Sequence, residues 1–133
     1  MKITRKIDKI IIHCSDTPNG KNFGVSDIDR WHKERGFREI GYHYIIKVNG
    51  MVDEGRSAEV AGAHCKGHNK YSLGICLIGR DRFNLAQWTS LFELIKDLKS
   101  LFPKATIHGH NELDTKGKTC PNFNVQEMMS HII

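Results

Sequence analysis

The sequence lacks any apolar run long enough to cross a membrane, since a spanning helix needs about 20 consecutive apolar residues. The apolar stretch nearest the N-terminus, from Ile10 to Ile12, is short and runs directly into His13. It is also too short for the core of a secretory signal peptide. We therefore expect no membrane span, and we expect the protein to be cytoplasmic when it is synthesised.

Paired cysteines are also missing. The chain has four cysteines, and none of them forms a Cys-x-x-Cys pair of the kind that builds most structural zinc sites. Without a signal peptide, free thiols are favoured over disulfides. Cys76 lies in the apolar run from Leu73 to Ile78 and is predicted to be a core residue. Cys120 lies in a polar loop beside lysines, where a neighbouring lysine or metal would favour its thiolate.

The sequence has no dense lysine or arginine block, no internal repeat and no low-complexity segment. Its formal net charge of +5 suits an anionic partner such as nucleic acid or a cell-wall polymer, although ordinary solubility explains it equally well. Paired cysteines and interleaved aromatic and basic residues are absent, so no nucleic-acid binding is expected. With 133 residues, 39% hydrophobic and 26% charged, the chain suits one globular domain over residues 1–133.

Strands are predicted where short apolar or alternating runs are bounded by turn residues. They span residues 7–12, 42–48, 51–54, 73–78 and 105–108. Asn49-Gly50 is a two-residue hairpin signal between the second and third of these strands. The run Leu73–Ile78 is apolar throughout, which is typical of a central strand. Residues 56–71 show little periodicity and predict a long loop, a type of segment that is often functional.

Helices are predicted in three places. Ser26 opens a capping-box-like start, and the helix that follows ends at Gly36. Asn84 caps the clearest helix, whose apolar residues repeat at helical spacing. Asn124 caps a short terminal helix that uses apolar residues up to Ile132. Together the elements predict one α/β domain, with a central mixed sheet of about five to six strands flanked by about three helices.

The segment from His108 to Cys120 carries the densest reactive chemistry in the sequence. Its histidines and its cysteine offer imidazole and thiolate, the preferred ligands of zinc. A further ligand must come from elsewhere, and His13 is the candidate because it ends a buried strand, where open sheets place ligands. If His13, His110 and Cys120 meet, they form a three-ligand site with one open position. That arrangement is typical of catalytic zinc.

Residue spacing alone leaves several roles open. His108 and His110 are two residues apart at a predicted strand, so both can point to one face and either can bind a metal. Glu112 is the carboxylate nearest to His110, and spacing assigns it no role. Tyr42 and Lys118 would each be ordinary residues alone, but a lysine beside a metal can stabilise negative charge on a reaction intermediate.

Five ordered motifs run through nearly the whole chain. They are Ile11-Ile12-His13-Cys14-Ser15, Trp31-His32-Lys33-Glu34-Arg35-Gly36, Gly41-Tyr42-His43-Tyr44-Ile45-Ile46, Gly62-Ala63-His64 through Asn69 with Ser72 and Gly74-Ile75, and His110-Asn111-Glu112 with Lys118-Thr119-Cys120-Pro121. This series resembles the type 2 N-acetylmuramoyl-L-alanine amidases, the family of the amidase-type phage lysozymes, or endolysins, and of the peptidoglycan recognition proteins. The likeness is most marked for the phage enzymes.

The resemblance implies a role for each matching residue. The implied ligands of Zn²⁺ are His13, His110 and Cys120, the implied catalytic pair is Tyr42 and Lys118, and the implied substrate-groove residues are His64 and Asn69. The following Asn111-Glu112 favours His110 over His108 as the ligand. The segment before Cys120 is slightly longer than in the phage enzymes, which raises Lys116 as an alternative to Lys118. Lys118 is preferred because its distance from Cys120 fits the family pattern.

The implied activity is zinc-dependent hydrolysis of the amide between N-acetylmuramic acid and L-alanine in peptidoglycan. The resemblance further implies a phage or prophage endolysin that acts on the cell wall after release, and we expect a monomer. One alternative is a non-catalytic peptidoglycan-binding module, which the presence of both Cys120 and Lys118 disfavours. Another is an amidase that also regulates an RNA polymerase, because some phage lysozymes bind and inhibit one.

Overall fold

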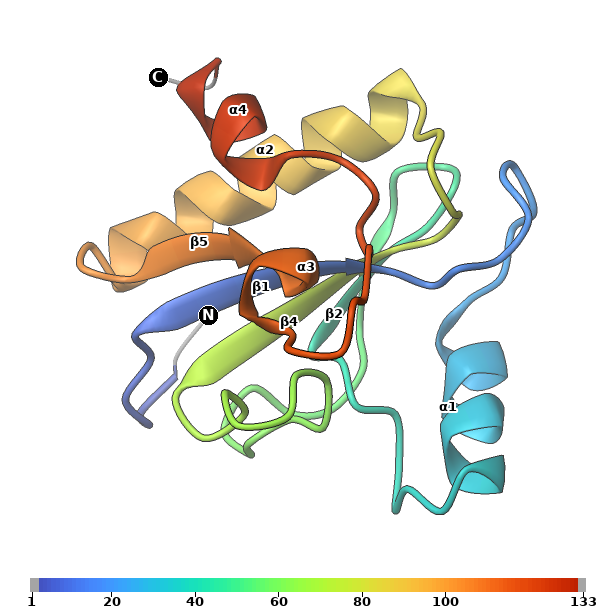
Figure 1. Ribbon diagram of the computed structural model, residues 1–133, viewed down its shortest axis with the longest axis horizontal. Helices are drawn as coiled ribbons and strands as arrows, with labels where there is room; N and C mark the ends of the chain where they lie inside the picture. Colours follow the sequence, from blue (N-terminus) through green and yellow to red (C-terminus); the bar gives the residue numbers. More distant parts are fainter. Residues whose placement is uncertain (1–2, 132–133) are drawn as a thin grey trace.

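A five-stranded mixed β-sheet forms the centre of the molecule in a computed structural model of the chain, which describes residues 3–131 (Figure 1). Ile132, which was expected in the terminal helix, lies outside the described residues. The strand order is β3-β2-β4-β1-β5. The strands are β1 (Lys9–Cys14), β2 (Tyr44–Ile46), β3 (Val52–Glu54), β4 (Ser72–Leu77) and β5 (Thr106–Gly109). The predicted α/β class and strand number are confirmed.

Four of the strands run in the same direction. β4 pairs in parallel with β2 and with β1, and β1 pairs in parallel with β5. β3 is the antiparallel edge strand and pairs with β2. The carboxyl ends of the parallel strands therefore meet at one edge of the sheet, where open α/β sheets bind ligands. The prediction of a central strand over residues 73–78 is confirmed, because β4 occupies the middle of the sheet.

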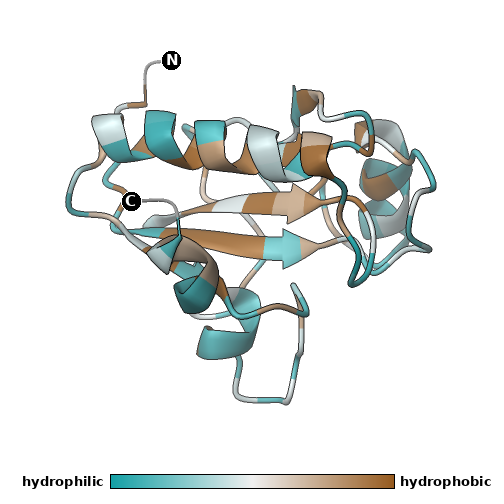
Figure 2. Cartoon of the chain, turned by 90° about the horizontal axis from the view of Figure 1, so that it is seen from above, coloured by the Kyte–Doolittle hydropathy of each residue, from teal (hydrophilic) through white to brown (hydrophobic). Residues whose placement is uncertain are grey.

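Helices cover both faces of this sheet. They are α1 (Val25–Glu34), α2 (Leu85–Leu101), α3 (His110–Leu113) and α4 (Val125–Ser130). Apolar residues of α2 and α4 pack with one face of the strands, and Ile28 of α1 packs with Ile45 and Cys76 on the other. Figure 2 shows the hydrophobic residues of α2 gathered on the side that faces the strands. Within residues 3–131, no helix is long and apolar enough to cross a membrane.

The ends of α1 and α2 agree with two of the predicted caps and differ from a third. Asn84 caps α2 as predicted, because its side chain accepts a hydrogen bond of 2.9 Å from the backbone N–H of Gln87. Gly36 follows the C-cap of α1 with φ +93°, a conformation that favours glycine. The predicted start of α1 at Ser26 is wrong. Gly24 is the N-cap, and its N–H donates to the carboxylate of Asp27 at 2.9 Å.

The turn between β2 and β3 differs from the predicted two-residue hairpin. The backbone N–H of Lys47 donates to the carbonyl of Met51 at 2.9 Å, which leaves three residues in the loop. Gly50 has φ +87°, the left-handed conformation that three-residue hairpin loops require at their last position. Asn49-Gly50 therefore marks the correct turn but predicts a loop that is one residue too short.

The prediction that His108 and His110 lie on one strand is wrong. β5 ends at Gly109, and His110 is the first residue of the one-turn helix α3. The N–H of Gly109 donates to Glu112 Oε2 at 2.8 Å, so Glu112 stabilises the start of α3. With α3 included, the described residues hold four helices instead of about three. The chain turns from β5 into α3 between His108 and His110, and this turn separates the two side chains.

Candidate metal centre

His13 is the most deeply buried of the predicted site residues. It lies near the carboxyl end of β1, opposite Cys76 of β4, and is 1% exposed. Burial lowers the pKa of His13 well below the usual histidine value, and the neighbouring rings of His64 and His110 lower it further. His13 is therefore neutral near pH 7, which is the form that binds metal ions.

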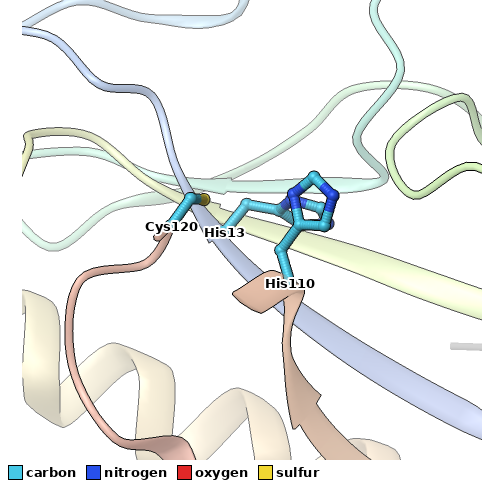
Figure 3. A group of neighbouring side chains, drawn as sticks. All are labelled: His13, His110 and Cys120. Carbon is cyan, nitrogen blue, oxygen red and sulfur yellow. The ribbon is translucent and has the colours of Figure 1, made fainter. Parts of the chain in front are cut away.

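His110 and Cys120 reach the same place from the segment that follows β5. The ring centroids of His13 and His110 are 4.6 Å apart. The N–H of Asn111 donates to the carbonyl of Cys120 at 2.8 Å, which ties α3 to the loop that carries the thiol. One donor atom from each of His13, His110 and Cys120 lies within 4.8 Å of the other two, and Figure 3 shows the three side chains converging.

The donors suit zinc in chemical type as well as in position. Burial lowers the pKa of His110, while the carboxylate of Asp114 opposes that shift. Contact with the thiol of Cys14, followed by burial, raises the pKa of Cys120. A bound cation would reverse this effect, because it attracts the thiolate. Two neutral imidazoles and one thiol make up a donor set that zinc prefers, and they leave one position for water or substrate.

A pocket of about 910 Å³ opens beside these donors. His110 and Cys120 contribute to its wall, together with the other predicted residues, namely Tyr42, His64, Asn69, Lys116 and Lys118. Arg35 and Lys66 add positive charge to the wall, and Asp16 and Asp114 add negative charge. The pocket wall therefore carries charged groups of both signs beside the candidate donors.

Tyr42 lies in the segment before β2, and its ring contacts His13, one of the candidate metal donors. Its ring centroid is 5.0 Å from that of His13 and 5.3 Å from that of His32. Burial raises the pKa of Tyr42 well above the usual tyrosine value, with a smaller contribution from nearby thiols. Its hydroxyl therefore keeps its proton at neutral pH and can donate a hydrogen bond.

Lys116 and Lys118 are both exposed side chains at the pocket. Asp114 Oδ2 accepts hydrogen bonds from their backbone N–H groups, at 2.8 Å for Lys116 and 2.9 Å for Lys118. The positive charge of Lys118 lowers the pKa of His110, after the larger effects of burial and Asp114. Of the two lysines, only Lys118 has an electrostatic effect on His110 among the causes of that shift.

His64 and Asn69 belong to the long loop before β4, which was predicted correctly as a loop. Asn69 Oδ1 accepts hydrogen bonds from the backbone N–H groups of His64, at 2.9 Å, and Cys65, at 3.0 Å. Asn69 therefore holds the loop in shape as well as lining the pocket. His64 Nδ1 lies 2.8 Å from His13 Nε2, a contact that the sequence analysis missed.

His108 points to a different part of the molecule. Its Nδ1 lies 3.2 Å from Glu112 Oε1, and its Nε2 lies 2.8 Å from the hydroxyl of Thr106. Glu112 also accepts from Gln126 Nε2 at 3.0 Å. Of the two histidines, the structure therefore brings His110 and not His108 close to His13, and Glu112 has a structural role in α3.

Two imidazoles and a thiol at the carboxyl ends of parallel strands, beside a pocket, form a donor set of the kind that binds zinc in hydrolytic enzymes. Residues 3–123 match the model of a family of hydrolases described as N-acetylmuramoyl-L-alanine amidase. The chain belongs to this family, and the resemblance drawn from its motifs is confirmed.

Relatives of known name agree with this assignment. The chain is 39% identical over 127 residues to the endolysin of Escherichia phage T7, covering 90% of this chain and 83% of that protein. It is 35% identical over 130 residues to the endolysin of Enterobacteria phage K11, covering 92% of this chain and 85% of that protein.

Solved structures share the fold. The amidase LysC from Clostridium intestinale superposes with a TM-score of 0.85 at 27% identity, covering 96% of this chain and 86% of that one. Drosophila PGRP-LB superposes with a TM-score of 0.78 at 28% identity, covering 91% of this chain and 78% of that one. The fold thus occurs in a bacterial amidase and in an insect protein.

Proposed function

We propose that this amidase hydrolyses the bond between N-acetylmuramic acid and L-alanine in peptidoglycan, with a zinc ion held by His13, His110 and Cys120. The observation that carries the proposal is the convergence of these three donors within 4.8 Å, beside the pocket of a chain that belongs to the amidase family. A bound zinc ion supplies a Lewis acid that polarises a carbonyl and lowers the pKa of water to about 7.

The residues around the donors contribute to the reaction through charge and hydrogen bonding. The ammonium group of Lys118 stabilises the negative oxygen that develops on the scissile carbonyl, since a positive charge beside that oxygen lowers the energy of the transition state. The Tyr42 hydroxyl keeps its proton because of its raised pKa. It can donate a hydrogen bond to the same oxygen, or it can pass a proton to the departing amine.

The substrate lies along the pocket wall. His64 and Asn69 flank the groove in this proposal, and Arg35 and Lys66 offer positive charge to carboxylates of the peptide. The net charge of +5 helps to retain the protein on an anionic wall, and this attraction weakens as salt rises. The protein acts on the wall after release from the cytoplasm.

The direct test is clearing of purified peptidoglycan with and without a chelator, followed by analysis of the products. We expect clearing to stop when zinc is removed and to return when it is restored. New L-alanine amino termini should appear while the glycan strands stay intact. Cut glycan strands with intact muramoyl amides would refute the reaction, and undiminished clearing after verified zinc removal would refute the role of the metal.

Two neighbouring histidines provide a matched pair of variants. His110→Ala should lose both zinc and activity, because it removes a donor. His108→Ala removes a ring two residues away that contacts Glu112 and Thr106 instead, so it should keep both. A non-catalytic peptidoglycan binder would behave differently, since it would retain wall binding without zinc and would release no product.

A further inference from the structure

His64 occupies a narrow slot between two glycines. A Cβ atom on Gly74 would lie 2.7 Å from Cγ of the His64 ring, and a Cβ atom on Gly62 would lie 2.6 Å from its Cδ2. Both distances are too short for real contacts, so any larger residue at either position would displace the ring. His64 is only 9% exposed. The backbone therefore holds this ring in one position.

Both nitrogens of the His64 ring have buried partners. Nδ1 lies 2.8 Å from Nε2 of His13, and Nε2 lies 3.1 Å from the hydroxyl oxygen of Ser72. Ser72 is the first residue of β4 and is fully buried. The three side chains form a continuous hydrogen-bonded row from the amino end of the central strand β4 to the candidate metal centre.

The direction of the hydrogen bond between Nε2 of His13 and Nδ1 of His64 decides whether His13 can bind a metal. A neutral imidazole has one N–H donor and one nitrogen with a free lone pair. If His64 donated to Nε2 of His13, the proton of His13 would sit on Nδ1, and neither nitrogen could bind a metal. If Nε2 of His13 donates to His64, the lone pair on Nδ1 is free. His64 then carries its own proton on Nε2 and donates it to Ser72.

We propose that His64 is a positioning residue, which accepts a hydrogen bond from Nε2 of His13 and so holds Nδ1 of His13 ready for zinc. This inference rests on the proposed zinc site and deepens it. Hydrogen bonds of this kind fix the orientation of a ligating histidine and make it a stronger ligand. Losing such a partner typically lowers metal affinity about 10- to 100-fold. Ser72 supports this arrangement, because its hydroxyl oxygen accepts a hydrogen bond from Nε2 of His64 and so keeps the proton of His64 on that nitrogen.

Zinc affinity of three variants, measured by competition with a chelator of known affinity, tests the proposal without reference to catalysis. His64→Leu removes the acceptor and should weaken zinc binding about 10- to 100-fold. His64→Asn places an amide oxygen near the position of Nδ1 and should restore most of that loss. Ser72→Ala leaves the bond to His13 intact and should have a smaller effect than His64→Leu.

Folding defects are separated from the positioning role by measuring the free energy of unfolding of each zinc-free variant. Long-range proton–nitrogen spectra of the zinc-loaded wild type provide a second readout. They should place the proton of His13 on Nε2 and that of His64 on Nε2. A proton on Nδ1 of His64 would overturn the proposal, as would wild-type zinc affinity in a folded His64→Leu variant.

The outcomes distinguish this inference from the proposed function. If the wild type binds zinc and cleaves the wall while His64→Leu binds zinc equally well, only the positioning role is wrong. If the wild type binds no zinc, the proposed function is wrong and the positioning role is wrong with it.

Discussion

The candidate centre has two sides that are built differently. The core side consists of His13 on β1 and His64 in its slot beside β4, and both are buried. The loop side consists of residues 110–122, which follow β5 and include the exposed Lys116 and Lys118. Sheet pairing holds the core side. His13 lies on β1, and Ile11 of the same strand is the register partner of Gly74, which packs against the His64 ring. Local hydrogen bonds hold the loop side, with Asp114 accepting from two backbone N–H groups.

This difference suggests a division of labour. A side chain locked by the sheet can fix the geometry of a metal ligand, but a change there disturbs packing as well. An exposed side chain on a loop contributes little to stability and is free to contact substrate. Substitutions on the core side should therefore change metal affinity and stability together. Substitutions of exposed loop-side residues that are not metal donors should change the reaction rate and leave stability nearly unaltered.

The largest effect is expected on the loop side. Lys118→Ala should lower kcat/KM for wall cleavage about 10²- to 10³-fold, because it removes a charge that stabilises the developing oxyanion. Zinc affinity and the free energy of unfolding should stay close to those of the wild type. Lys116→Ala is the matched control and should retain most of the activity. A greater loss for Lys116→Ala would reverse the assignment of the two lysines.

A core-side change should affect stability more than any loop-side change. Gly74→Ala places a Cβ 2.7 Å from the His64 ring, and overpacking of this kind costs about 1–3 kcal/mol. Urea unfolding of the zinc-free protein would measure the loss, and zinc affinity should fall with it. Gly24→Ala is the control for an added methyl group without a clash, because its Cβ would meet only Lys47 Cδ at 3.7 Å. Its own loss should come from the N-cap of α1, where alanine is less favourable than glycine. Equal stability of the two variants would argue against a tight slot around His64.

Acid should weaken the core side through His43, which binds no metal in this proposal and whose ring centroid lies 5.7 Å from that of His64. Burial lowers the pKa of His43 from 6.5 to about 4. The unfolded chain therefore binds a proton between about pH 6.5 and pH 4 that the folded chain does not, so stability falls as pH drops through this window. The loss due to His43 should reach about 2–3 kcal/mol near pH 4.5.

The measurement is the free energy of unfolding of zinc-free protein at pH 7 and pH 4.5, for the wild type and for His43→Asn. The variant keeps an acceptor for the N–H of Gly74, which donates to His43 Nδ1 at 3.0 Å in the wild type. It should show a weaker dependence on pH. An unchanged dependence would show that other groups, such as His32, cause the acid sensitivity.

The smallest effect is expected from Asp114→Ala on the loop side. The substitution removes the acceptor for the N–H groups of Lys116 and Lys118, so the loop should become more mobile. Activity should fall by less than about tenfold, since ordinary hydrogen bonds contribute little individually. Faster hydrogen exchange at the backbone N–H groups of Lys116 and Lys118 would show that the loop has become more mobile. A loss of zinc binding as severe as that of His110→Ala would show that Asp114 is needed to form the metal site, and would contradict its assignment as a residue that only orders the loop.

The sequence predicted the elements that have strong local signals. β4 was evident from its apolar run, α2 from its helical periodicity and Asn84, and the end of α1 from Gly36. The helix α3 was missed because four residues are too few to show periodicity. Without it, His110 was assigned to the strand that ends at Gly109, and residue spacing could not choose between His108 and His110.

Contacts between distant residues were beyond the reach of local patterns. His13 and His64 are 51 positions apart, and their contact depends on the register of β1 with β4. Cys14 and Cys120 are 106 positions apart, and the N–H of Cys14 donates to the thiol of Cys120 at 2.9 Å. The family resemblance supplied the donor set, but it did not supply the hydrogen bonds that orient the donors.

The wide separation of the donors along the chain has a consequence for folding. Closing so long a loop costs conformational entropy, so an unfolded chain will seldom gather His13 and Cys120 around one ion. A ligand that binds only the native state stabilises it by about 4 kcal/mol at a thousandfold excess over its Kd. Zinc would then fasten the short edge strand β5 and the segment up to Cys120 to β1. Chelation should loosen that edge of the sheet first and leave α2 and β4 folded.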